Sequence, residues 1–270
     1  MPELPEVEVT RLGIAPAVTG WRATGAVTRV GGLRYPLPDD LGRRLAGQVL
    51  REVRRRGKYL LLHFDEGRLL LHLGMSGSLR LLPAGTPAAR HDHVDLLFGK
   101  VLLRLTDPRR FGSLLWLPPE PAGHPLLDVL GIEPLEAAFT GRWLHAALRG
   151  RRGPVKPAIM DSHLVVGIGN IYASESLFRA GIDPRRAAGR ISGQRCDRLA
   201  DAVRATLNEA IAAGGSSLKD FIGSDGGKGW FQQSHFVYGR AGEPCRACGG
   251  PVRQVRQAGR ATFFCPRCQR

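Results

Sequence analysis

Four cysteines near the end of the chain have the spacing of a metal site. CRAC and CPRC are two C-x2-C pairs separated by 16 residues, a spacing typical of four-thiolate zinc sites. The alternative, two disulfides or unused thiols, is disfavoured because the chain has five cysteines and an odd number argues against a disulfide framework. Four thiolates fill a tetrahedral zinc ion and leave no position for water. The sequence therefore predicts one structural Zn²⁺, with these ligands: Cys245, Cys248, Cys265 and Cys268.

The segment between the two cysteine pairs, VRQVRQAGRATFF, predicts a β-hairpin with its turn near Ala258 and Gly259. Arg260 lies beside this tip, so a hairpin pinned by zinc would carry it into a nucleic-acid groove. The alternative is a solvated basic face. Cys196, outside the two pairs, is expected to be a small buried or boundary residue without a chemical role.

The first residues, MPELPEVE, place three glutamates and two prolines within eight residues of a basic chain. Removal of Met1, expected before a small residue, would expose the secondary amine of Pro2. Because α-amino groups have a pKa of about 7.7–8.0, a neutral fraction exists near pH 7 and can attack a sugar carbon to form an iminium. Glu3 would then move the protons. The alternative is that Glu3 and Glu6 only provide charge at the start of a helix.

A second segment, MDSHLVVGIGNIYASESLF, joins two apolar stretches through Gly-x-Gly-Asn, with a helix expected from about Ile171. Glycines allow a phosphate to approach the backbone, and a helix N-terminus offers N–H groups. Lys156, Asp161 and the basic run RGRRG nearby favour phosphate contact over a simple packing turn.

The turn TDPRRFG carries Arg109, Arg110 and Phe111 between two strands. An aromatic residue flanked by arginines on an exposed turn can wedge between bases, although Phe111 in the core is the alternative. Met75, between glycines in GMSGS, would lie on another turn. Lys58 begins a strand, and most such lysines are simply solvated.

Short apolar runs separated by turn residues begin at Tyr59 and predict an antiparallel sandwich or barrel. Before them, Pro5 suits a first helical turn, followed by Val7, Leu12 and Ile14 at roughly helical spacing. The predicted strands are YLLLHF, RLLLHL, LRLL, HVDLLF, VLLRL and SLLWL.

In the second half of the chain, the pattern of apolar residues predicts helices over about 136–149, 170–180 and 195–213. GGSSLKDFIGSDGGKGWFQQ then predicts a short helix and a glycine-rich loop, and the tail from Val237 is a separate small unit. The third helix has an apolar face formed by Leu199, Val203, Leu207 and Ile211.

The chain has 270 residues, enough for about two modest domains, and 39 Lys and Arg against 24 Asp and Glu give a net charge of +15. Arginine supplies most of this charge and suits phosphate, although an acidic membrane surface or protein also fits a basic chain. No apolar run approaches a membrane span and no signal peptide is evident, which predicts a soluble, intracellular protein.

Seven motifs occur in order from Pro2 to Gln269: PELPEVE, HLGMSG, TDPRRFG, VVGIGNIYASESLF, SLKDF…SDG, VYGR and CxxC…GRxTxFCPxCQ. Together they resemble the bacterial formamidopyrimidine-DNA glycosylase family. The resemblance implies an α+β multi-domain fold. An N-terminal helix and catalytic β-sandwich would span 1–130, a helix-two-turn-helix domain 131–225, and a zinc-ribbon finger 236–270.

The resemblance also implies the activity of a bifunctional DNA glycosylase and AP lyase of base excision repair. Its substrate would be damaged double-stranded DNA carrying oxidised purines such as 8-oxoguanine and formamidopyrimidines. The protein would act as a cytoplasmic, nucleoid-associated monomer, without a membrane or small-molecule cofactor.

Catalytic roles carry over from the family motifs to five positions. Pro2 would attack C1′ of the damaged nucleotide, Glu3 would act as acid and base, and Glu6 would support the reaction near the sugar. Lys58 would take part in β-elimination. Arg260 would serve δ-elimination and hold a phosphate.

Other positions match family residues that bind DNA. Asn170 would hold a phosphate, and Met75, Arg109 and Phe111 would fill the gap left by the extruded base. Arg151 stands where lysine also occurs in the family, which preserves charge but not geometry. The expected DNA contacts are His91, Arg109, Arg151, Asn170, Lys156, Met75 and Phe111.

The nearest alternative is the sister family, endonuclease VIII, which prefers oxidised pyrimidines and usually begins PEGPE, where this chain has Leu4. Another alternative is a catalytically silent DNA-binding scaffold, which would lack Pro2, Glu3 or Lys58; this chain has all three. A transcription factor is disfavoured because that function would not explain the acidic residues at the N-terminus. The chain departs from the family in one loop, where it has SDGGKGWFQQ and relatives often have SDGKPGYFQQ. Because the resemblance implies that this loop closes over the extruded base, the departure bears on lesion preference.

Overall fold

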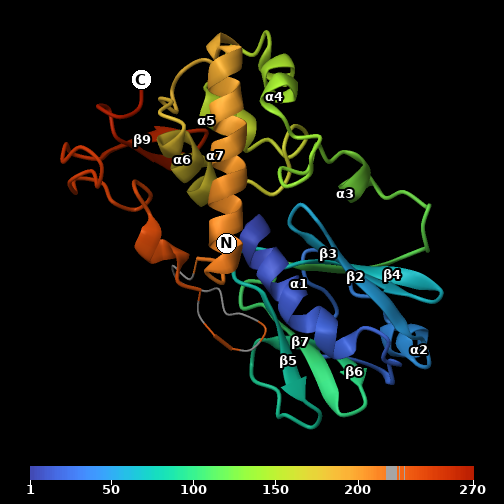
Figure 1. Cartoon of the computed structure of the whole chain (residues 1–270). Coiled ribbons are helices and arrows are strands. Elements are labelled where there is room, and N and C mark those ends of the chain that lie inside the picture. The colour runs from blue at the N-terminus through green and yellow to red at the C-terminus, as the bar shows by residue number, and fades with distance from the viewer. Residues whose placement is uncertain (217–223, 225, 228) are drawn as a thin grey trace. The chain divides into compact units, whose positions relative to one another are not determined.

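A computed structural model describes residues 1–216, 224, 226–227 and 229–270 (Figure 1). They form two compact units, Met1–Asp128 with Ala213–Gln232 and Val129–Ala212 with Gln233–Arg270. The short helix and loop expected in GGSSLKDFIGSDGGKGWFQQ lie largely outside the described residues. Among the helices that are described, none has both the length and the apolar character needed to cross a lipid bilayer.

The first unit contains two antiparallel four-stranded sheets, in the orders β1-β6-β7-β5 and β2-β3-β4-β8, which confirms the predicted sandwich. The six strands predicted from Tyr59 onward are all present, whereas β1 and β2 were not predicted. The strands are β1 (Gly25–Thr28), β2 (Leu50–Arg56), β3 (Tyr59–Phe64), β4 (Gly67–His72), β5 (Ser78–Pro83), β6 (Asp92–Phe98), β7 (Val101–Thr106) and β8 (Ser113–Leu117). The helices are α1 (Leu4–Val18), α2 (Leu41–Leu45) and α3 (Pro125–Asp128).

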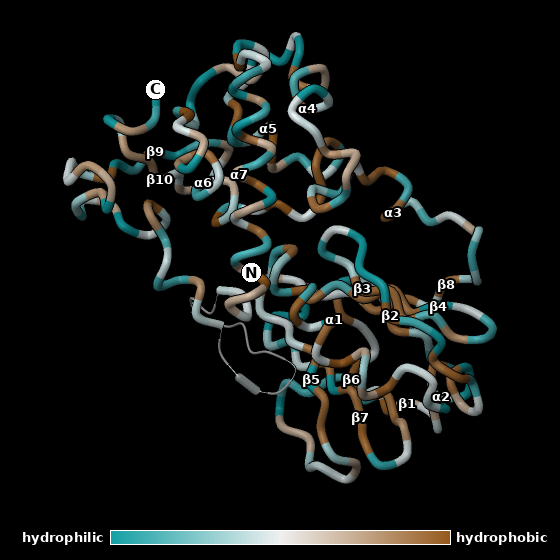
Figure 2. Tube along the Cα trace, viewed as in Figure 1, coloured by the Kyte–Doolittle hydropathy of each residue, from teal (hydrophilic) through white to brown (hydrophobic). Residues whose placement is uncertain are grey.

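Successive side chains of a strand point to opposite faces of its sheet, and this alternation divides the apolar residues of the first unit between two clusters. Leu60 and Leu62 of β3 are fully buried in one apolar cluster with Leu103 of β7, so both sheets contribute to it. Leu61, between them, belongs to a second cluster with Leu70, against which α3 packs. Figure 2 shows the hydrophobic stretches gathered on these strands. Each buried leucine contributes about 1.5–3 kcal/mol of hydrophobic stabilisation.

Helix α1 has Pro5 in its first turn, as predicted, because the missing N–H of proline is not needed there. Val7 and Ile14 are buried against the sheets. The helical spacing predicted for Val7, Leu12 and Ile14 is confirmed, but Leu12 does not share the buried face and is 48 % exposed. Five residues after Val7, it lies roughly 140° around the helix from that side chain.

The second unit is mostly helical and ends in a hairpin. Predicted helices 170–180 and 195–213 are confirmed closely, and 136–149 begins later, at Gly141, where the Thr140 hydroxyl caps it by accepting from the Trp143 N–H. The elements are α4 (Gly141–Leu148), α5 (Val155–Ile159), α6 (Asn170–Arg179), η1 (Ala188–Arg190), α7 (Gly193–Ala212), β9 (Arg253–Gln257) and β10 (Arg260–Phe264). A further short helix, η2 (Phe231–Ser234), lies where the chain passes between the units.

Helix α7 buries the predicted face, except that Ile211 near its end is only partly covered. Cys196 is fully buried on the same helix, and burial raises the pKa of its thiol to about 11. This confirms the prediction that Cys196 is a small core residue. A thiol with so high a pKa is a poor nucleophile.

Candidate functional site

Glu6 holds the residues that precede helix α1. The backbone N–H of Glu3 donates to Oε2 of Glu6 at 2.8 Å, and the backbone N–H of Ser216 donates to Oε1 at 2.8 Å. Glu3 and Glu6 are each 2 % exposed, and Pro2 is buried while Met1 is exposed. Both carboxylate oxygens of Glu6 thus orient backbone, so Glu6 fixes where Glu3 and Pro2 lie.

Met75 and Phe111 lie on two turns of the first unit, between β4 and β5 and between β7 and β8. Phe111 is 47 % exposed and Met75 37 % exposed, so the alternative that Phe111 belongs to the core was wrong. The guanidinium of Arg109 lies 4.7 Å from the centre of the Phe111 ring, a cation–π contact that orients both side chains. The turns therefore present a wedge of two apolar side chains and an arginine.

The two wedge turns touch through glycines. A Cβ on Gly74, whose φ is +65°, would lie 2.5 Å from the backbone nitrogen of Gly112. A Cβ on Gly112 would lie 2.8 Å from the carbonyl oxygen of His72. Contacts that short are not tolerated, so glycine at both positions is what lets Met75 and Phe111 stand on adjoining turns.

His72 and Arg34 were missed by sequence reasoning, although His72 stands within HLGMSG. Burial, reinforced by the positive charges of Lys58 and Arg34, lowers the pKa of His72 to about 4. Its Nδ1 accepts from the Gly74 N–H at 3.0 Å, so the neutral ring carries its proton on Nε2. One groove of this unit is lined by Met1, Arg34, His72, Gly74, Met75, Arg110 and Phe111.

Lys58 follows Gly57 in the two-residue turn that joins β2 to β3. Arg55 donates to the Gly57 carbonyl at 3.1 Å and to a carboxylate oxygen of Glu8 on α1 at 2.9 Å. Burial raises the pKa of Glu8, but the guanidinium groups of Arg11 and Arg55 outweigh it and the pKa is lowered overall. A largely buried ion pair therefore ties the Lys58 turn to the helix that follows Pro2.

In the second unit, Lys156 joins the start of α6 to the C-terminal hairpin. Lys156 is 1 % exposed, and its ammonium donates to Oδ1 of Asn170 at 2.6 Å, the Ala261 carbonyl at 3.0 Å and the Thr262 hydroxyl at 2.9 Å. The amide nitrogen of Asn170 also donates to the Ala261 carbonyl, at 3.0 Å. A groove here is lined by Lys156, Pro157, Met160, Asp161, Asn170, Gln257, Ala258, Arg260 and Thr262.

The hairpin turns at Ala258 and Gly259, as predicted, because Gln257 pairs with Arg260. Both turn residues have positive φ, 45° and 76°, which is the type I′ geometry of two-residue hairpins. Arg260 is exposed beside this tip and faces the groove that contains Asn170.

Arg151 and His91 are the remaining predicted DNA contacts. Arg151 is exposed, and its guanidinium lies 3.3 Å from a carboxylate oxygen of Asp161. Burial by itself would raise the pKa of Asp161. Hydrogen bonds from His163 and Arg151 outweigh this effect and lower the pKa overall, so the carboxylate is ionised. His91 is partly exposed on the loop before β6 and lies in the other unit.

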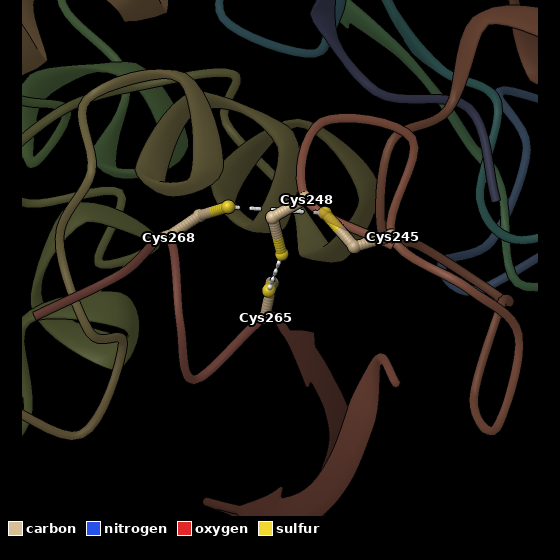
Figure 3. A group of neighbouring side chains, drawn as sticks. All are labelled: Cys245, Cys248, Cys265 and Cys268. Atoms are coloured by element: carbon tan, nitrogen blue, oxygen red, sulfur yellow. Dashed lines mark hydrogen bonds between the residues drawn. The ribbon is translucent and has the colours of Figure 1, made fainter. Parts of the chain in front are cut away.

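The four predicted zinc ligands converge at the base of the hairpin (Figure 3). Their sulfur atoms all lie within 4.8 Å of one another, with 3.9 Å between Cys245 and Cys268 and 3.5 Å between Cys248 and Cys265. A tetrahedral site with Zn–S bonds of about 2.3 Å requires sulfur atoms about 3.8 Å apart. The donor set and spacing fit one structural zinc ion.

Three family models match consecutive parts of the chain. The formamidopyrimidine-DNA glycosylase N-terminal domain matches residues 1–114, its H2TH domain residues 130–222, and the zinc finger found in FPG and IleRS residues 242–270.

Complete relatives and solved structures agree with these matches. The formamidopyrimidine-DNA glycosylase of Aromatoleum aromaticum is 59 % identical over 270 residues and covers all of both chains. A crystal structure of a Lactococcus lactis Fpg mutant with DNA containing Fapy-dG has a TM-score of 0.91 at 31 % identity, covering all of both chains. The Lactococcus lactis Fpg complex with abasic-site DNA has a TM-score of 0.89 at 31 % identity over 99 % of each chain. The chain therefore belongs to the formamidopyrimidine-DNA glycosylase family.

Proposed function

We propose that this chain is a bifunctional DNA glycosylase and AP lyase that excises oxidised purines from double-stranded DNA. The observation that carries the proposal is the groove lined by Met1, His72, Met75 and Phe111, because the residue that precedes Pro2 lines it together with the two apolar side chains of the wedge. The activity follows from the family and from this arrangement of its motifs.

The wedge serves base extrusion. The target sugar carbon is hidden in a stacked duplex, so the damaged nucleotide must leave the stack at a cost of a few kcal/mol. Met75 and Phe111 fill the vacancy and offset part of this cost, and Arg109 contacts the base left opposite. His91 holds the backbone beside them.

The chemistry starts at Pro2 once Met1 has been removed. The Pro2 nitrogen attacks C1′, and the base leaves with the electrons of the glycosidic bond and a proton. Glu3 protonates the sugar ring oxygen, the ring opens and an iminium forms. Loss of a proton from C2′ then breaks the C3′–O bond, assisted by Lys58. Loss of a proton from C4′ of the resulting conjugated iminium breaks the C5′–O bond, assisted by Arg260.

The second unit holds the backbone of the damaged strand. Asn170, Arg260 and Arg151 contact phosphates, which makes binding steeply salt-dependent. Lys156 already donates to three partners, so it supports this site by positioning Asn170 and the hairpin. Zinc, held by the four cysteines, keeps the hairpin folded.

Three functional segments are proposed: 1–130 for catalysis, 131–225 for DNA binding and 236–270 for the zinc finger. The protein would act as a cytoplasmic, nucleoid-associated monomer.

Borohydride trapping tests the proposal. Purified protein is incubated with a duplex containing one 8-oxoguanine opposite cytosine, reduced, and mapped by mass spectrometry. We expect a covalent adduct on Pro2 that is lost in Pro2→Gly. Glu3→Gln, which preserves the size of the side chain, should still bind the duplex but form little adduct.

A parallel reaction with an oxidised pyrimidine separates the two enzyme families. An adduct with the pyrimidine alone would assign the chain to a pyrimidine-directed activity. Tight binding without an adduct on either lesion would favour a silent scaffold instead.

A further inference from the structure

One buried carboxylate connects the two turns that carry the wedge. Asp107 follows β7 and is 0 % exposed. Its Oδ2 accepts from the Gly112 N–H at 2.7 Å, and its Oδ1 accepts from the Arg109 N–H at 3.3 Å. The hydroxyl of Ser76 donates to Oδ1 at 3.3 Å. Since Ser76 adjoins Met75, both turns depend on the same side chain.

The backbone of Asp107 reaches a third predicted DNA contact. Its N–H donates to the carbonyl of His91 at 3.0 Å, and its carbonyl accepts from the Arg110 N–H at 3.2 Å. Nε2 of His93 lies 2.9 Å from the same carbonyl. His91, the 75–76 turn and the 109–112 turn are thus all attached to one residue.

The surroundings of Asp107 are unusual for a carboxylate. Within the described part of the chain, its side-chain partners are two backbone N–H groups and a hydroxyl, and no Lys or Arg side chain forms an ion pair with it. Burial of a charge is costly unless hydrogen bonds compensate for it. A neutral residue such as asparagine would avoid this cost, but its single side-chain oxygen cannot occupy both acceptor positions, Oδ1 facing Arg109 and Ser76 and Oδ2 facing Gly112.

We propose that Asp107 is a positioning residue that sets Met75, Arg109 and Phe111 in register for insertion into the duplex. This inference rests on the proposed function, because insertion matters only where a nucleotide must be extruded. Asp107 is fully buried, which leaves no surface for contact with a sugar or base. It acts through the turns, so its loss should affect stacked substrates most.

Asp107→Asn tests this with almost no change in volume. An asparagine has one oxygen and one NH2 group in place of two oxygens. If the asparagine oxygen faces the N–H of Gly112, the NH2 group faces the N–H of Arg109. In the flipped orientation the oxygen faces Arg109 and the NH2 group faces the N–H of Gly112. Either orientation leaves one N–H group of the 109–112 turn without its Asp107 acceptor, which should shift that turn relative to the turn that carries Ser76.

Two substrates separate positioning from general damage. Wild type and Asp107→Asn are compared in single turnover on an intact duplex containing 8-oxoguanine and on a single strand containing an abasic site, which needs no extrusion. We expect Asp107→Asn to lower the excision rate on the duplex about 10- to 100-fold and to keep abasic cleavage within about threefold of wild type. Equal losses on the two substrates, or no loss on either, would overturn the proposal.

Asp95→Asn is the matched control. Asp95 is 2 % exposed on β6 and accepts from Arg104 at 2.8 Å, so its substitution also disturbs a buried carboxylate. Its ion-pair partners Arg104 and Arg29 lie outside the wedge turns. We expect this variant to lose thermal stability and to keep the wild-type ratio of the two rates.

Hydrogen exchange gives a readout that does not require activity. In Asp107→Asn, peptides covering 72–78 and 107–113 should exchange faster than in Asp95→Asn. Unchanged protection there would overturn the inference even if the chain excises lesions. If the wild type cleaves neither substrate, the proposed function fails, and exchange still decides whether Asp107 orders the turns.

Discussion

The backbone N–H of Glu3 donates to the carboxylate of Glu6 at 2.8 Å, and the second oxygen of Glu6 accepts from Ser216. In Glu6→Gln, one of these two N–H groups loses its acceptor, at a cost of about 1–3 kcal/mol. We expect the excision rate to fall about tenfold or more, because Pro2 and Glu3 lose their fixed position. Single-turnover kinetics on a lesion duplex checks this.

Glu209→Gln provides the comparison for Glu6→Gln. Glu209 forms an ion pair with Arg179 in the other unit and its side chain is 54 % exposed. Its substitution should leave the rate unchanged. Wild-type kinetics for Glu6→Gln would show that Glu6 has no part in placing Glu3.

Gly74→Ala tests the contact between the wedge turns. The new Cβ would collide with Gly112 and Phe111, so the turns must separate. We expect a loss of more than about 1 kcal/mol in stability together with weaker excision from duplex DNA. Gly85→Ala is a strict control, since Gly85 also has positive φ, +81°, but no atom lies near its Cβ position. Similar activity losses in the two variants would point to backbone strain and not to the contact.

Cys248→Ser tests the metal site. Loss of one thiolate should lower zinc affinity by at least about 100-fold, more than the loss of an outer-shell partner causes. Because Arg260 lies on the hairpin next to the cysteines, strand cleavage should fall together with zinc content, measured by a colorimetric chelator. Cys196→Ser should retain zinc. If the Cys248→Ser protein lacks zinc but cleaves the strand at the normal rate, the zinc-bound hairpin is not needed for the reaction.

His72 should make stability depend on pH. Above pH 6.5 the imidazole is neutral in both the folded and unfolded states, and its contribution is fully present. As pH falls from 6.5 toward 4, the unfolded chain binds a proton that the folded chain does not, because the folded pKa is about 4. The free energy of unfolding should therefore decrease on acidification, by up to about 3 kcal/mol from this group.

His72→Asn removes this titration and keeps an acceptor for the Gly74 N–H. Urea unfolding at pH 7 and pH 4.5 should show a smaller loss of stability in the variant than in wild type. Equal losses in the two proteins would mean that His72 titrates normally.

Local chemistry made much of the molecule predictable from its sequence. Apolar residues dominate two short segments that lie between turn residues, YLLLHF and VLLRL. Both segments are strands of the sandwich. The C-x2-C spacing predicted a zinc site because ligand geometry limits how far apart thiolates can lie. By contrast, β2 has the sequence LREVRRR, whose charges hide the strand pattern, so it was found only in the structure.

The sequence by itself determined the zinc ligands, the hairpin turn at Ala258 and Gly259, and the family motifs that point to Pro2 and Glu3. Tertiary structure alone decided that Phe111 is exposed, that Lys156 is buried with its donors occupied, and that Asp107 serves both wedge turns. Spacing rules act over a few residues, whereas Asp107 meets Ser76 across 31 residues of chain and Lys156 meets Thr262 across 106. Burial and hydrogen bonding depend on which segments the fold brings together, and that is settled only when the whole chain packs.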